Sequence, residues 1–238
     1  LNKINPMHIS RVWEAMIQEG YSAHVPQANH RRLSKALNDA VRRGLISRNP
    51  CQYVTTPKPE MKENQVLNKD QVVSLLAEAS KTDYYSAIFV SLYTGMRRNE
   101  LLSLRWKDID LNLGVIYLNQ SIWVSEGKVH YITPKTKSGR RAIPLTPNTT
   151  IHLRKELDKQ MAWIKIKDES PVFVTTQGTL IQPSAITHAF KRIAKRIGLD
   201  ALRFHDLRHS HATLMLKEGI HPKVVQERLG HSKISTTM

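Results

Sequence analysis

A proline-rich segment without hydrophobic periodicity divides this chain into two parts of unequal length. The segment Thr55–Asn64 has the sequence Thr-Thr-Pro-Lys-Pro-Glu-Met-Lys-Glu-Asn. Proline restricts the backbone and removes an amide donor, and a charged segment with no apolar period has no face to bury. We therefore predict two domains, residues 1–60 and 67–238, joined by a linker at residues 61–66.

The shorter part carries the pattern of two helices. The first is predicted at residues 6–20, because Asn5 is a favoured N-cap and Pro6 a favoured first helical residue. The second is predicted at residues 26–44. Its apolar face consists of Leu33, Leu37 and Ala40. Its polar face carries a row at helical spacing, formed by Arg31, Lys35, Asn38 and Arg42. A helix with a core face and a basic face suits contact with DNA phosphates, although a solvated basic face gives the same pattern.

The longer part begins helical, changes to short β-branched segments and returns to helix. Asn68 with Gln71 three residues later resembles a capping box, and a helix is expected from there to Ala79. Further helices are predicted at residues 84–94, 98–104, 147–166, 183–197, 205–217 and 222–229. Short strands at residues 115–118, 129–133 and 141–145 are predicted to form one small antiparallel sheet. The predicted fold class is mostly α with a small antiparallel β-sheet.

The charge of the chain indicates a polyanionic partner. Lys and Arg number 36 against 20 Asp and Glu, a net charge of +16, and both parts are basic. Double-stranded DNA gripped from two sides fits this distribution, whereas a soluble basic protein remains the simpler alternative. No apolar run is long enough to span a bilayer, so no membrane partner is expected. The single cysteine, Cys51, excludes an internal disulfide and favours a reducing, cytoplasmic compartment.

Three short segments contain residue types that can hold a phosphodiester. They have the sequences T-G-M-R-R-N-E at residues 94–100, H-D-L-R at 205–208 and L-G-H at 229–231. Arginine stays ionised and offers two donors to two oxygens at once, so Arg97 and Arg208 are candidates to hold a phosphate without a metal. Arg98 is interpreted as an ordinary surface arginine.

In this order the segments resemble the motifs T-G-x-R-x-x-E, H-x-x-R and L-G-H-x-x-x-x-T-T of the tyrosine recombinase (phage and transposon integrase) family. The resemblance covers the whole chain, and Asn99 departs from the small Gly or Ser usual at that position. The family's nucleophilic tyrosine follows the third motif, so we expect it just beyond Met238. The last tyrosine present is Tyr131, which precedes both histidine motifs.

The resemblance implies a two-domain DNA clamp. The shorter domain would be helical and bind the core of the DNA site, and the longer one would be catalytic. It further implies strand breakage and rejoining through a 3′-phosphotyrosyl intermediate, for integration or excision of a mobile element. The family acts as a homotetramer on paired double-stranded DNA sites and requires no cofactor.

The resemblance also implies roles for individual residues. Arg97, Arg208 and His231 would stabilise the pentavalent phosphorane, and Glu100 would support the arginines. His205 would assist proton transfer near neutral pH. The general acid would be a lysine in a hairpin at residues 134–141, where we prefer Lys135 to Lys137 for its place at the end of a strand. Alternatively both lysines contact backbone phosphates, as expected of Lys137 and Arg140.

Three other interpretations of the chain are weaker or less complete. His205 and His209 have a zinc-like spacing, but the intervening sequence lacks the glutamate of H-E-x-x-H. Asp108 and Asp110 could suggest a metal-dependent nuclease, yet aspartates between a helix and a strand usually cap turns. We expect no metal and, without a phosphate-binding glycine motif, no nucleotide. The main alternative is a DNA-binding protein derived from a recombinase that does not cleave.

Overall fold

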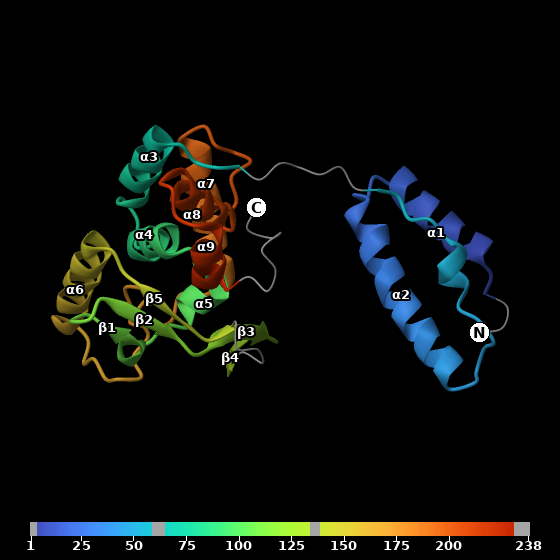
Figure 1. Cartoon of the computed structure of the whole chain (residues 1–238), viewed down its shortest axis with the longest axis horizontal. Helices are drawn as coiled ribbons and strands as arrows, with labels where there is room; N and C mark the ends of the chain where they lie inside the picture. The colour runs from blue at the N-terminus through green and yellow to red at the C-terminus, as the bar shows by residue number, and fades with distance from the viewer. Residues whose placement is uncertain (1–3, 59–64, 134–138, 231–238) are drawn as a thin grey trace. The chain divides into compact units, whose positions relative to one another are not determined.

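The computed structural model describes residues 4–58, 65–133 and 139–230 (Figure 1). Contacts divide the chain into two compact units, Leu1–Glu63 and Asn64–Met238. The roles assigned above to the two parts remain predictions. Within the described ranges, no helix combines the length and apolar character needed to cross a membrane.

The first unit is built on the two expected helices. They are α1 (Pro6–Gln18) and α2 (His24–Arg42), followed by the short 3₁₀ helix η1 (Pro50–Tyr53). The Asn5 side chain accepts a hydrogen bond from the amide of His8, so the predicted start of α1 is confirmed. A small core holds the unit together and consists of Ile9, Trp13, Leu37 and Cys51.

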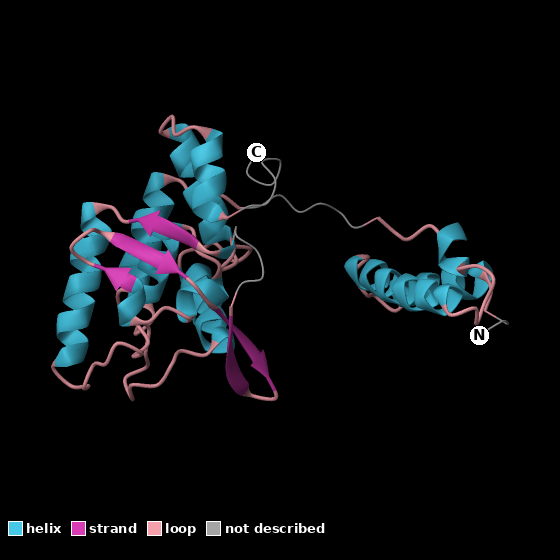
Figure 2. Cartoon of the chain, turned by 60° about the horizontal axis from the view of Figure 1, so that its bottom comes forward, coloured by secondary structure: helices cyan, strands magenta, loops and turns pink. Residues whose placement is uncertain are grey.

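The helices of the second unit follow the predicted order. They are α3 (Lys69–Ala79), α4 (Tyr85–Thr94), α5 (Arg98–Leu102), the 3₁₀ helix η2 (Trp106–Asp108), α6 (Pro147–Met161), α7 (Pro183–Arg196), α8 (Asp206–Lys217) and α9 (Pro222–Leu229). The capping box of Asn68 and Gln71 is present at the start of α3, with both reciprocal bonds formed. The predicted fold class is confirmed, because helices dominate and the strands are short (Figure 2).

The prediction of a single sheet is wrong, because the strands that the structure describes form two. One sheet has the order β1 (Ile109–Asp110), β2 (Val115–Leu118), β5 (Arg141–Pro144), and the other pairs β3 (Ser121–Ser125) with β4 (Lys128–Ile132). All pairs are antiparallel.

The cause is a two-residue turn between β3 and β4. Glu126 and Gly127 both have positive φ, 51° and 75°, the conformation that closes a tight hairpin. This turn pairs β4 with β3, a strand that was not predicted, and leaves β5 to pair with β2. The segment at residues 134–141 was predicted to be a hairpin turn, but the strands on either side of it belong to different sheets.

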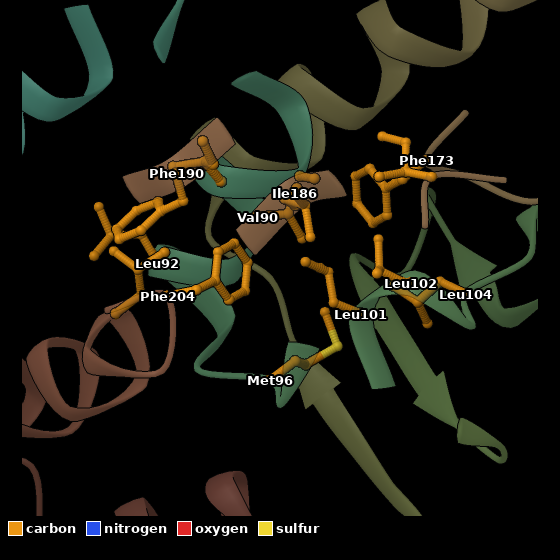
Figure 3. Packing of buried hydrophobic residues seen from close by; sticks show 14 of the residues in the cluster. Val90, Leu92, Met96, Leu101, Leu102, Leu104, Phe173, Ile186, Phe190 and Phe204 are labelled. Atoms are coloured by element: carbon orange, nitrogen blue, oxygen red, sulfur yellow. The ribbon is translucent and has the colours of Figure 1, made fainter. Parts of the chain in front are cut away.

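The core of the second unit is built around α4 and positions the turn that follows this helix. Seven residues of α4 are buried, and the side chains shown in Figure 3 pack around this helix and α7. Phe190 and Phe204 lie edge to face with ring centroids 5.4 Å apart. α4 also contacts α8, so this core brings the first and second predicted motifs to the same part of the unit.

Gly95 lets the turn after α4 approach α8 and α9 closely. It ends α4 in the left-handed conformation, with φ 66°. A Cβ at this position would lie 2.6 Å from side-chain atoms of both His211 and Leu229. Glycine is therefore required both by the backbone angle and by the space.

Candidate active site

Arg97 is held in a fixed position at the start of α5. Its backbone amide donates to Glu100 Oε2 at 2.9 Å, and its Nη1 donates to Glu100 Oε1 at 2.7 Å. Nη2 donates to the carbonyl oxygen of Gly230 at 3.2 Å. The side chain stays 42% exposed, so part of it remains accessible from the cavity that it lines.

Arg208 lies on α8 and is buried. Its Nη1 donates to the carbonyl oxygen of Gly95 and its Nη2 to that of Leu229, both at 2.7 Å. Burial, and next the charge of Arg97, lower the Arg208 pKa to about 9, so the group is still charged at neutral pH. Among the described residues no carboxylate forms an ion pair with this cation, and its hydrogen bonds go to the two backbone carbonyls.

Glu100 joins Arg97 to a second arginine that the sequence did not single out. Arg141 Nη2 donates to Glu100 Oε2 at 2.8 Å and Nη1 to Oε1 at 3.3 Å. Burial opposes the ionisation of Glu100. The hydrogen bond and charge of Arg141 and the charge of Arg97 outweigh it and lower the Glu100 pKa to about 2. The carboxylate is therefore ionised and bound by two guanidinium groups.

The end of α9 is the point at which three arginines meet. The successive carbonyls of Arg228, Leu229 and Gly230 accept N–H groups from Arg141, Arg208 and Arg97, respectively. Carbonyls in the last turn of a helix lack intrahelical partners and carry the negative end of the helix dipole, so cations are favoured there. We call this group of three guanidinium groups the arginine cluster.

His205 stands at the start of α8 beside an open cavity. Burial, and next the charges of His209 and Arg208, lower the His205 pKa, so the ring is neutral at neutral pH and able to accept a proton. The cavity has a volume of about 590 Å³. Its lining includes Arg97, Glu100, Ser121, Arg203 and His205. An exposed guanidinium and a neutral imidazole thus face one space large enough for a phosphate and its sugar.

Arg98 and Asn99 also line the cavity. Arg98 is half-buried and donates to Thr187 Oγ1 at 2.7 Å and to Asn99 Oδ1 at 3.2 Å. The interpretation of Arg98 as an ordinary surface arginine is therefore wrong. Asn99, which departs from the family motif, accepts from Arg98, and Arg98 joins the start of α5 to α7 through Thr187.

The aspartates considered for metal chemistry have structural roles. Asp108 accepts hydrogen bonds from the guanidinium of Arg105, and Asp110 Oδ1 accepts from the amides of Asn112 and Leu113. His205 and His209 lie with ring centroids 5.0 Å apart. Across the described ranges, no three His, Cys, Asp or Glu residues are grouped to hold a metal ion.

Several predicted site residues fall outside these contacts. Lys135, Lys137 and His231 lie outside the described residues. Arg140 is exposed just before β5, and Arg31 and Lys35 are exposed on α2. Arg42 is exposed and pairs with Asp39, whereas Asn38 accepts from the side chain of Asn49 at 2.8 Å. The DNA contacts assigned to this row remain predictions.

The sequence contained one indication that Arg141 belongs to the site. Arg140 and Arg141 are adjacent at a predicted strand, and neighbouring strand residues point to opposite faces. One of the two was therefore expected to point inward, where a buried guanidinium needs acceptors such as a carboxylate or backbone carbonyls. Glu100, already expected near the site, was a candidate for such an acceptor.

The lowered pKa of Glu100 predicts a specific loss of stability in acid. The unfolded chain binds the proton near the ordinary value of 4.5 and the folded chain only near 2, so this stabilisation is present above 4.5 and disappears as the pH falls to 2. We expect about 3 kcal/mol from this group. In urea unfolding, Glu100→Gln should be less stable than the parent at pH 6, and the gap should narrow towards pH 2. The surface variant Glu14→Gln is the control, and a gap independent of pH would contradict the assignment.

Comparison with known proteins gives consistent matches. The model of the phage integrase family matches residues 65–238. A tyrosine recombinase XerC-like protein of Caldanaerobacter subterraneus subsp. tengcongensis is 31% identical over 98% of this chain and 66% of its own length. The ICEBs1 integrase of Bacillus subtilis is 26% identical over 100% of this chain and 66% of its own length. The chain thus spans about two thirds of these curated relatives.

Solved structures with the same fold include a DNA complex. The Tn1549 transposon integrase in complex with a circular intermediate DNA superposes with a TM-score of 0.88 and 22% identity. The superposition covers 100% of this chain and 80% of that one. At this identity the likeness establishes the fold.

Proposed function

Because this chain belongs to the phage integrase family, which includes tyrosine recombinases, we propose that it is the core of a site-specific DNA recombinase. The observation that carries the proposal is the arginine cluster beside the cavity. Two of its members, Arg97 and Arg208, come from separate motifs of the sequence and converge on adjacent carbonyls of α9. Fixed cations of this kind stabilise the additional negative charge of a phosphorane.

The proposed reaction exchanges one phosphate ester for another. The oxygen of a tyrosine expected beyond Met238 forms a bond to the scissile phosphorus, and the bond from phosphorus to the 5′ oxygen breaks. His205 assists with the proton of the attacking hydroxyl, and Lys135 supplies a proton to the leaving oxygen. The 3′-phosphotyrosyl bond retains the energy for rejoining, so neither ATP nor a metal is required.

The proposed partner is double-stranded DNA, bound by both units. The Tn1549 integrase superposes on this chain while bound to DNA, and the net charge of +16 suits the same partner. We further propose a homotetramer on paired sites and a role in integration or excision of a mobile element. In this assignment residues 1–60 bind the core of the DNA site and residues 67–238 form the catalytic domain.

A comparison of two proteins should show that DNA binding does not require the tyrosine and that DNA cleavage does. One is the 238-residue chain, and the other, which we call the extended protein, continues through the expected tyrosine. Both should bind duplex DNA with an affinity that falls by roughly 10³-fold or more between 50 and 200 mM salt, as expected for several phosphate contacts. Gel-shift titrations measure the salt slope, and denaturing gels detect the covalent adduct.

Only the extended protein should give an SDS-stable protein–DNA band, and EDTA should not prevent it. Binding without an adduct in the extended protein would favour the alternative, a recombinase-derived DNA-binding protein that does not cleave. Cleavage abolished by EDTA would indicate a metal-dependent nuclease. Binding that is insensitive to salt would contradict the proposal for both proteins.

A further inference from the structure

We propose that Arg141 is a positioning residue for DNA cleavage, acting on Arg97 through Glu100 and on the end of α9. The inference rests on the proposed function of the site. Arg141 begins β5, and its side chain is only 7% exposed, so it is placed to act on protein groups rather than on DNA.

The first contact of Arg141 orients the Glu100 carboxylate. Both Glu100 oxygens accept from Arg141, and the same two oxygens accept from the amide and Nη1 of Arg97. The carboxylate is only 8% exposed, so water cannot easily replace a lost donor. With Arg141 absent, the described residues leave Glu100 with donors from Arg97 alone, so the carboxylate is held only by the side chain and amide that it should position. The position of the Arg97 guanidinium would then be less fixed.

The second contact fixes the last turn of α9. Arg141 Nε donates to the carbonyl oxygen of Arg228 at 2.7 Å, next to the two carbonyls that hold Arg208 and Arg97. The side chain of Arg228 also bonds to the carbonyl of Pro144 at 2.8 Å, so β5 and α9 are joined twice. One residue of β5 thereby sets the position of the helix end to which both candidate catalytic arginines are attached.

The proposal predicts a rate effect without a matching effect on DNA affinity. In the extended protein, Arg141→Gln should lower the single-turnover cleavage rate at saturating DNA by about 10²-fold, the size expected when catalytic groups shift by about 1 Å. The dissociation constant for DNA should change little, because Arg141 does not face the ligand. Arg141→Lys keeps the charge but not the planar fork, and should recover only part of the rate.

A double-mutant cycle tests whether Arg141 acts through Glu100. Glu100→Gln and Arg141→Gln should each slow cleavage, and the double variant should be little slower than the slower single one. Effects that multiply would show that Arg141 acts independently of Glu100 and would overturn the part of the inference that runs through Glu100.

Arg105→Gln provides a matched structural control. Arg105 is also largely buried and forms an ion pair with the buried Asp108, with Nε to Oδ2 at 2.9 Å. Its loss should lower the melting temperature and leave the cleavage rate at saturating DNA unchanged. If Arg105→Gln slows cleavage as much as Arg141→Gln, the effect is general destabilisation and the inference fails.

Failure of the proposed function and failure of this inference would give different experimental results. No adduct from the unmodified extended protein would refute the function itself. A normal adduct together with parental cleavage by Arg141→Gln would refute only the role of Arg141. If Arg141→Gln does not fold, Arg141→Lys decides in its place: a parental rate overturns the inference, and a slowed rate at unchanged DNA affinity supports it.

Discussion

Replacing Arg208 by alanine in the extended protein should lower the rate of covalent adduct formation by about 10²–10³-fold, the usual cost of losing a donor directed at transition-state charge. Arg208 is charged and buried, and within the described residues it has only backbone carbonyls as hydrogen-bond acceptors. A phosphorane is the anion that would satisfy it. Most of the DNA affinity should remain, because affinity is spread over many phosphate contacts.

The structure adds a requirement to this experiment. Alanine at position 208 leaves the carbonyls of Gly95 and Leu229 without their donor, at a cost of about 1–3 kcal/mol each. Adduct formation must therefore be measured at a temperature at which circular dichroism shows the variant to be folded. Arg208→Lys retains a charge without the fork and should remain strongly impaired.

Two further variants complete the comparison. Arg97→Ala should be impaired to a similar extent, since its guanidinium lines the cavity. His231→Ala should be milder, because the role expected of this histidine is the donation of one hydrogen bond to the phosphate. Cleavage at a near-parental rate by folded Arg208→Ala would contradict the assigned site.

Replacing Lys135 by alanine should slow cleavage of ordinary DNA by about 10²–10⁴-fold, the range for a general acid. A general acid matters only when the leaving oxygen needs a proton. The same variant should therefore recover substantially on DNA whose bridging 5′ oxygen is replaced by sulfur, which leaves without one. Single-turnover rates on the two substrates measure the contrast.

Lys137→Ala is the matched control for this experiment. It should show little difference between the two substrates, and only weaker, salt-sensitive binding. If the two lysines exchange these behaviours, Lys137 is the acid. If sulfur rescues neither variant, the acid lies elsewhere in the protein.

Local signals in the sequence predicted most of the helices. Asn5 before Pro6 and the Asn68–Gln71 pair set helix starts that the structure reproduces, because capping depends on a few adjacent residues. Helices α5 and α6 end earlier than predicted, at Leu102 and Met161.

Such local signals could not predict which strands pair or which side chains contact one another. The division into two sheets depends on the Glu126–Gly127 turn, which the sequence analysis did not consider, and β3 was missed with it. The motifs identified Arg97, Glu100 and Arg208 as candidates. They did not reveal Arg141, since its bond to Glu100 spans 41 positions of the chain and depends on how β5 meets α9.

The arginine cluster also determines when conformational entropy is lost. A free arginine side chain samples many rotamers, and ordering one costs up to about 2 kcal/mol. Arg97 and Arg208 are already ordered by the carbonyls of Gly230 and Leu229, so this cost falls on folding rather than on DNA binding. Under the proposed function, a phosphate that enters the cavity would meet donors that are already in place, and more of the binding free energy of the DNA would remain available for aligning the nucleophile.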